Sequence, residues 1–173
     1  MKVKFILILF FQFIFFNSIL YSNEIDIVSD NIKILENGEI IESIETIAII
    51  KKKGLYIEGD YSEYNKKAGI IKFETNVLFN DRFKNITVET ESAEYNQKLD
   101  ILETTGITNV KIENKYEIIS SNIFYNRKLQ QIYSKKETTI KDIDGNIYNL
   151  ENNFQFNLNT EIISTEKTNI IDT

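Results

Sequence analysis

A short pattern that ends in an aromatic residue and an asparagine recurs along most of this 173-residue chain at a nearly constant interval. It is clear at Tyr64-Asn65, Tyr95-Asn96 and Tyr125-Asn126 and looser at Phe156-Asn157, so the asparagines lie 31, 30 and 31 residues apart. A degenerate first copy lies around Ile34, 30 residues before Tyr64. A constant period indicates one small unit that is stacked repeatedly, because a unit of this size cannot bury its own apolar face. The chain is therefore predicted to be a repeat protein.

Apolar and polar residues alternate within each repeat. The runs from Ile71 to Phe79 and from Ile86 to Glu89 follow this rule, which is the period-two pattern of strands with one buried face. Turn-forming residues separate the runs twice in each period, for example at Asn37-Gly38 and Asp144-Gly145. Each repeat is therefore predicted to be a hairpin of two strands of about 10 residues, the first of which ends in Tyr-Asn.

The expected fold class is all-β. Antiparallel hairpin repeats of about 30 residues would roll up as a jelly roll or an open sandwich, since propeller blades have longer periods and leucine-rich repeats carry a leucine ladder that is missing here. The chain has no proline, a residue that often protects edge strands. Its absence indicates an edge that is available for pairing with another chain.

The N-terminal 22 residues are typical of a secretory signal peptide. Lys2 and Lys4 precede an apolar run from Phe5 to Phe16 that is interrupted once, by Gln12, and a small residue follows at Ser22. This run is shorter than the roughly 20 residues of a membrane-spanning helix. We predict a signal peptide over residues 1–22 and one β-jellyroll domain over residues 23–173, which is either complete or truncated at its C-terminal end. The alternative is an uncleaved anchor with its lysines in the cytoplasm.

The charge balance is acidic, with 26 acidic against 20 basic residues and a net charge of −6. No basic stripe is evident along the sequence. This composition argues against nucleic acid as a partner and against docking on anionic headgroups by charge. A lipid ligand is therefore expected to be bound through its acyl chains.

The residue types that commonly carry catalysis are missing. The chain has neither His nor Cys, which removes the common general base, the soft metal ligands and any disulfide. We expect no enzymatic activity, no cofactor and no metal. Glu89 and Glu91 would share one strand face and are interpreted as solvated.

Two further motifs have architectural interpretations. The segment 142–146 has the oxygen spacing of the start of a calcium loop, but Asn153 stands where such a loop requires Glu, so a hairpin turn is favoured. In the repeated motif, the Tyr ring is predicted to pack at a sheet margin with its hydroxyl in water, and the Asn to open a turn.

The repeat, with Ile57-Glu58-Gly59-Asp60 before Tyr64-Asn65 and with Thr108-Asn109-Val110-Lys111-Ile112 further on, resembles the OstA-like family of lipopolysaccharide transport proteins over roughly residues 24–165. That family includes the periplasmic bridge LptA and the periplasmic N-terminal domain of the translocon LptD. The resemblance implies an open, V-shaped β-jellyroll whose apolar groove carries lipopolysaccharide to the outer membrane. It also implies a periplasmic location associated with the outer membrane, and head-to-tail edge-strand pairing with other transport proteins.

The chain departs from the family pattern in two ways. Thr75 and Thr108 stand where members often have a glycine before the Asn-Val pair, although Gly106 is close. The chain also ends at Thr173 after a new apolar pair, Ile170-Ile171. This end fits either a fragment of a longer translocon or a bridge whose last edge takes a partner.

The apolar face has two interpretations. Its residues are plain core, or a subset of them lines a lipid path; the candidates for that path are Ile57, Ile71, Phe73, Val77, Phe79, Ile86, Val88, Ile101, Val110, Ile112, Ile118, Ile132, Ile140 and Ile147. Two rival functions stay open. One is a structural or adhesive exported β-repeat protein with a solid core, and the other is an inner-membrane-anchored, LptC-like member of the same transport system.

Overall fold

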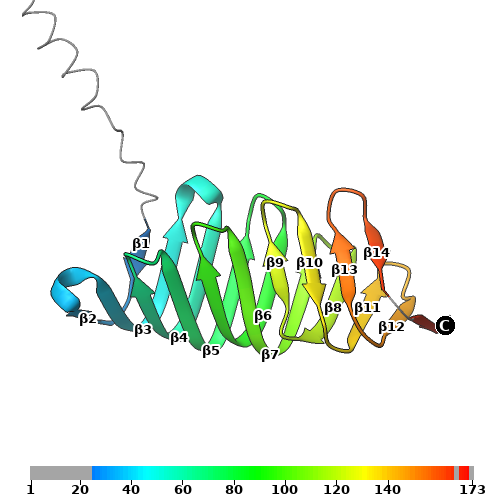
Figure 1. Cartoon of the computed structure of the whole chain (residues 1–173), viewed down its shortest axis with the longest axis horizontal. Coiled ribbons are helices and arrows are strands. Elements are labelled where there is room, and N and C mark those ends of the chain that lie inside the picture. Colours follow the sequence, from blue (N-terminus) through cyan, green and yellow to red (C-terminus); the bar gives the residue numbers. More distant parts are fainter. Residues whose placement is uncertain (1–24, 166–167, 172–173) are drawn as a thin grey trace, which may run out of the picture.

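The computed structural model describes residues 25–165 and 168–171, which form one antiparallel sheet of 15 strands (Figure 1). The all-β prediction is confirmed. In chain order the elements are β1 (Asp26–Val28), β2 (Asn31–Leu35), the 3-10 turn η1 (Glu36–Gly38), β3 (Ile40–Ile50), the 3-10 turn η2 (Lys51–Lys53), β4 (Leu55–Asn65), β5 (Ile70–Asp81), β6 (Ile86–Asn96), β7 (Ile101–Ile112), β8 (Tyr116–Ser121), β9 (Phe124–Asn126), β10 (Gln131–Ser134), β11 (Thr138–Asp142), β12 (Ile147–Leu150), β13 (Phe154–Asn157), β14 (Ile162–Ser164) and β15 (Thr168–Ile171). Within the described ranges, no helix has the length and apolar character needed to span a membrane. The predicted signal peptide lies outside them.

Bends in the middle of the long strands fold the sheet into two facing walls. Strands β3 to β7 each contribute one half to each wall. Wall 1 also contains β1, β8, β11, β12 and β15, and wall 2 also contains β2, β9, β10, β13 and β14. After β7 the strands break at the bend instead of crossing it, so they are shorter than predicted, at three to six residues. The strands follow one another from β1 and β2 at one end to β13 and β14 at the other (Figure 1).

The bends are built from irregular backbone. Glu45, Thr75 and Gly106 lie at the bends of β3, β5 and β7 with φ of 50°, 62° and 86°. The pairing register shifts at the same level between β4 and β5, between β5 and β6, and between β6 and β7. Such bulges redirect a strand and increase its twist, which is what turns one sheet into two walls.

Small hydroxyl side chains fill the angle between the walls. The Ser43 and Ser62 hydroxyls are 2.8 Å apart, and so are those of Thr104 and Thr108. All four side chains are buried. Since each hydroxyl finds a hydrogen-bond partner next to it, these polar groups tolerate burial and allow the two walls to approach closely.

The hairpin turns gather along two lips on the side opposite the bends. Lip 1 carries the turns at residues 51–54, 82–85, 113–115 and 143–146, and lip 2 carries those at 36–39, 66–69, 97–100, 127–130 and 158–161. The two lips meet along a line that we call the mouth. Two turns therefore occur in each period, as predicted.

The repeated asparagines begin the lip 2 turns. Oδ1 of Asn65, Asn96, Asn126 and Asn157 accepts a hydrogen bond from the backbone N–H three residues on, at 2.8 to 3.1 Å. This capping satisfies a turn N–H that would otherwise lack a partner. The predicted role of the asparagine is confirmed.

Candidate functional site

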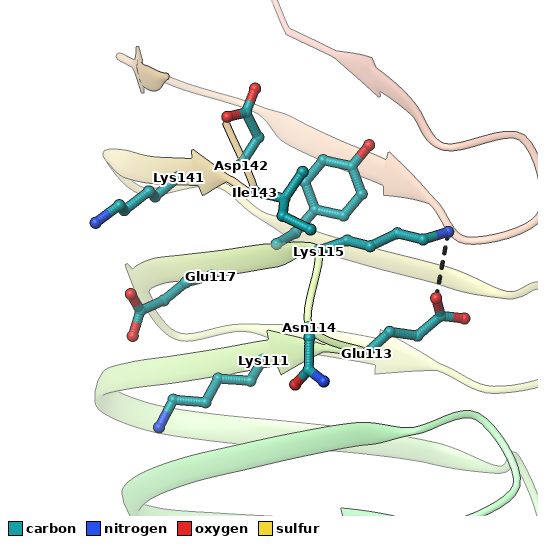
Figure 2. A pocket seen from close by; sticks show the side chains of 9 residues that line it. Lys111, Glu113, Asn114, Lys115, Glu117, Lys141, Asp142 and Ile143 are labelled. Atoms are coloured by element: carbon teal, nitrogen blue, oxygen red, sulfur yellow. Dashed lines mark ion pairs between the residues drawn. The ribbon is translucent and has the colours of Figure 1, made fainter. Parts of the chain in front are cut away.

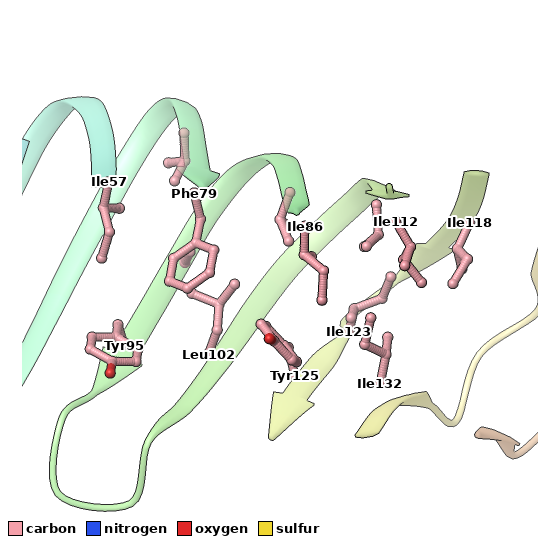
Figure 3. Packing of buried hydrophobic residues seen from close by; sticks show 14 of the residues in the cluster. Ile57, Phe79, Ile86, Tyr95, Leu102, Ile112, Ile118, Ile123, Tyr125 and Ile132 are labelled. Atoms are coloured by element: carbon pink, nitrogen blue, oxygen red, sulfur yellow. The ribbon is translucent and has the colours of Figure 1, made fainter. Parts of the chain in front are cut away.

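One apolar cluster fills the space between the walls, from β3 to β13 (Figure 3). Twelve of the fourteen groove candidates belong to it, while Ile101 and Ile147 are half-buried. Sequence reasoning missed eleven members of the cluster: Ala48, Ile50, Leu55, Ala93, Tyr95, Leu102, Ile123, Tyr125, Leu150, Phe154 and Phe156. Their inward period-two positions were the available signal.

The interior is suited chemically to acyl chains. Burial of a methylene group in such surroundings is worth about 0.8 kcal/mol. In this structure, however, the protein's own side chains occupy the space: Phe79 packs between the rings of Tyr95 and Tyr125, with centroids 5.9 and 6.2 Å away. An acyl chain can therefore enter only where the walls part.

A buried ionic network closes the mouth at mid-length. We call it the clasp; it comprises Lys53 and Asp81 beside lip 1 and Tyr95, Asp100, Tyr125 and Arg127 beside lip 2. Arg127 Nε donates to Asp81 Oδ2 at 2.6 Å, and Arg127 Nη2 donates to the Lys53 carbonyl at 2.9 Å. Asp81 is 0% exposed and Arg127 is 9% exposed. Because removal of either partner would strand a buried charge, this pair holds the lips together.

The rest of the clasp surrounds Asp100. Its carboxylate accepts hydrogen bonds from Lys53 Nζ at 3.0 Å, from Arg127 Nη1 at 3.0 Å and from the Tyr95 hydroxyl. Burial and the hydrogen bond to Asp100 both raise the pKa of Tyr95. Burial alone would raise the pKa of Asp100 as well, but the donors around the carboxylate outweigh it and hold that pKa below its usual value. The clasp therefore contains an ionised carboxylate and a neutral phenol at neutral pH.

The repeated tyrosines have a different role from the predicted one. The hydroxyls of Tyr95 and Tyr125 were expected in water, yet both residues are almost completely buried. The Tyr125 hydroxyl donates to Asp81 Oδ2 at 2.9 Å, and the Tyr95 hydroxyl donates to Asp100. The prediction was wrong because it placed the motif at the margin of an open sheet, whereas the facing lip covers it here.

A second contact joins the lips nearer the C-terminal end. Lys115 Nζ of lip 1 lies 2.8 Å from Glu161 Oε1 of lip 2 and 3.2 Å from Glu113 Oε2. Lys115 also lines a shallow hollow of about 260 Å³, together with Lys111 of β7, Glu113 of the turn and Asp142 of β11 (Figure 2). These groups are solvent-exposed, so the contact is much weaker than the clasp.

Comparison with known structures identifies the fold of this chain. The chain is similar to the crystal structure of LptH, the LptA homologous periplasmic component of the conserved lipopolysaccharide transport device from Pseudomonas aeruginosa, with a TM-score of 0.61. The match covers 71% of this chain and 97% of LptH at 10% sequence identity. The chain has the LptA-like fold. No family model and no curated protein matches the sequence.

The LptA-like fold brings basic residues together at the mouth. The five neighbouring turns at 51–54, 66–69, 82–85, 97–100 and 127–130 hold Lys51, Lys52, Lys53, Lys66, Lys67, Arg82, Lys84, Lys98, Arg127 and Lys128, and Asp100 is their one acidic residue. Backbone hydrogen bonds connect successive turns, and the clasp joins the two lips. We call these five turns the basic mouth. The expectation of no basic stripe was wrong, because these cations are separated in sequence and only the repeat aligns them.

The weaker candidates have architectural roles in the LptA-like fold. Asp142 accepts hydrogen bonds from the backbone N–H groups of Asp144 and Asn146 within a hairpin turn, so the turn interpretation is confirmed. Glu89 and Glu91 are exposed. Within residues 25–165 and 168–171, no cluster of His, Cys, Asp or Glu has the arrangement of a metal site.

The edge at the N-terminal end of the LptA-like fold is apolar. Among the residues that the structure describes, strand β2 pairs only with β3, and its Ile32 and Ile34 are 52% and 64% exposed. Val28 of β1 is also exposed. An exposed, unpaired edge with large apolar side chains is a template for the addition of another strand.

Proposed function

We propose that this chain is a non-enzymatic lipopolysaccharide carrier of the periplasm. The observation that carries the proposal is the continuous apolar interior between two walls whose lips are joined at the mouth by hydrogen bonds and ion pairs of side chains. Lipopolysaccharide would place its acyl chains between the walls, and its sugars would remain outside. The LptA-like fold supports this assignment because LptH, which shares that fold, is a component of a lipopolysaccharide transport device.

We also propose a location and partners for the domain. Residues 1–22 would be a signal peptide that directs the domain to the periplasm. The domain would serve either as a stand-alone bridge like LptA or as the N-terminal domain of an LptD translocon, in association with the outer membrane. In both cases the exposed edge at β1 and β2 would accept a strand from a neighbouring transport protein, a common mode of recognition.

A structural or adhesive repeat protein is the second candidate. The observation that favours it is the filled interior, in which twelve groove candidates pack against one another with almost no exposure. A solid core of this kind would never open, and no lipid would be recovered with the purified protein.

Photo-crosslinking in lipopolysaccharide-producing cells tests the proposal. A benzophenone amino acid would replace Phe73 or Phe79, which are buried aromatic residues, and in a control it would replace Lys72, which is exposed on the same strand. We expect lipopolysaccharide adducts at the two inward positions and none at position 72. If a folded, exported protein gave no adduct at either inward position, the carrier proposal would fail and the structural repeat would be the better account.

A further inference from the structure

The basic mouth is an unusual surface for an acidic protein. Its five turns hold ten of the chain's 20 basic residues, although the net charge is −6. Successive lip 2 turns stack so closely that Lys98 Nζ donates to the Lys67 carbonyl at 2.7 Å and Lys128 Nζ donates to the Lys98 carbonyl at 2.9 Å. Like charges held in one row repel one another; the carboxylates of Asp26, Asp100 and Asp81 partly offset this repulsion by pairing with Lys51, Lys53 and Arg127.

Apolar side chains stand among these cations. Phe83 of lip 1 and Leu99 and Leu129 of lip 2 are 66%, 56% and 60% exposed. A surface that combines exposed apolar groups with positive charge is complementary to the region of an anionic lipid where the chains join the headgroup.

The clasp supplies a second, independent observation. The Gln97 side chain occupies the position in its repeat that Arg127 occupies in the next, and it is 6% exposed. Its Nε2 is buried without a hydrogen-bond acceptor, while its backbone carbonyl accepts from Lys53 Nζ at 3.0 Å. A buried donor without a partner is rare and costly, and this one belongs to a residue that contacts the Lys53 ammonium group through its backbone.

We propose that the basic mouth is a binding site for the phosphate groups of an anionic lipid whose acyl chains lie between the walls. This inference rests on the proposed carrier function. When the lips part, Lys53 and Arg127 exchange the carboxylates of Asp100 and Asp81 for phosphate oxygens, which guanidinium and ammonium groups bind in the same way. Gln97 Nε2 then gains its acceptor. Because the lips have then parted, water reaches the two released carboxylates and solvates their charges.

The proposal assigns opposite effects to the two charges of the clasp. Loss of a cation weakens phosphate binding, whereas loss of the competing carboxylate strengthens it. A purely structural network would lose stability with either change and would show no preference among lipids.

The test measures binding of two lipids to the purified full chain in a non-ionic detergent: lipid A, and the same lipid A after enzymatic removal of its phosphates. Inorganic phosphate is the third ligand. The variants are Lys98→Gln with Lys128→Gln, and Asp100→Asn; Lys72→Gln, an exposed cation outside the mouth, is the matched control. The lysine pair lies on the surface, so this variant reports on the site even if Asp100→Asn proves unstable.

We expect the lysine pair variant to bind phosphorylated lipid A about tenfold more weakly and the dephosphorylated form as well as the wild type does. Asp100→Asn should bind the phosphorylated form several-fold more tightly, and Lys72→Gln should change nothing. Equal binding of both lipids, without an effect of the lysine pair, would overturn the phosphate site and leave the carrier function standing. Failure to bind either lipid would overturn both the phosphate site and the carrier function. Competition by inorganic phosphate at the concentration of the lipid would mean a site for free phosphate, against this proposal.

Discussion

Thr75 is a β-branched residue at a φ of 62°, in the bend of β5. A side chain of this kind is strained in the left-handed region by about 1–2 kcal/mol. A glycine would relieve this strain, but part of the gain in stability would be lost because glycine raises the entropy of the unfolded chain. We expect Thr75→Gly to stabilise the protein by about 0.5–1 kcal/mol and Gly106→Ala, at the equivalent bend of β7, to destabilise it by about 1 kcal/mol. Urea unfolding measures both changes. A loss of stability in Thr75→Gly would contradict this account of the bends.

Arg127 is predicted to be the most costly single side chain of the clasp to remove. Arg127→Met keeps the length of the side chain but leaves the fully buried Asp81 without its cation. The expected loss is about 3 kcal/mol of unfolding free energy. The control is Lys115→Met at the exposed second contact, which should cost less than about 1 kcal/mol. Equal losses in the two variants would mean that burial does not distinguish the clasp from a surface ion pair.

Asp100 makes the clasp sensitive to acid. Its pKa is lower in the folded protein than the ordinary value of 3.8, so it contributes stability above that pH, and the contribution is lost as the pH falls through the folded pKa. We expect the difference in stability between the wild type and Asp100→Asn to be largest at neutral pH and to shrink below about pH 4. Urea midpoints across this range test the sign. A difference that grew on acidification would contradict it.

Among the elements, strand β2, whose outer edge is open, is predicted to direct head-to-tail assembly. Replacement of both Ile32 and Ile34 by Lys puts charge on the edge, which opposes strand addition, while it costs little stability because both side chains are exposed. Sedimentation velocity should then show loss of concentration-dependent oligomers. Ile107→Lys, at an exposed apolar residue away from the edges, should leave assembly intact. Oligomers that persist after the β2 changes would remove the edge from the account.

The elements themselves were largely predictable, because period-two alternation and turn residues depend on local sequence. The strands that end at Asn65 and Asn96 and the turn at Gly145 follow directly from these signals. The splitting of the strands after β7 could not be predicted from these signals, because it depends on how each chain segment crosses the bend. Thr75 and Gly106 lie at the bend, but only the pairing of β5 and β7 with β6 shows that the two residues lie at the same level of the sheet.

The clasp and the basic mouth could not be predicted from the sequence for a different reason. Their residues come from turns on opposite lips, so that Lys53 meets Asp100 and Arg127 meets Asp81 only after the walls close. Tyr95 and Tyr125 were singled out by their spacing, which was a valid signal of importance. Their burial depends on that closure, and no local pattern encodes it.

In the whole molecule, lipid is proposed to enter the interior through the mouth when the lips part. The chain has no cysteine, so two cysteines introduced at Lys53 and Asp100 would be its only thiols. Lys53 Nζ and Asp100 Oδ1 lie 3.0 Å apart across the mouth. A short, reducible, thiol-specific linker would then join the lips covalently. The decisive measurement is the uptake of lipid A by the double cysteine variant, first with the linker intact and then after the linker is reduced. We predict that the linked form takes up almost no lipid and that reduction restores uptake to the level of the unlinked double variant. Equal uptake by the linked and reduced forms would show that lipid does not pass between the lips, and would contradict entry through the mouth.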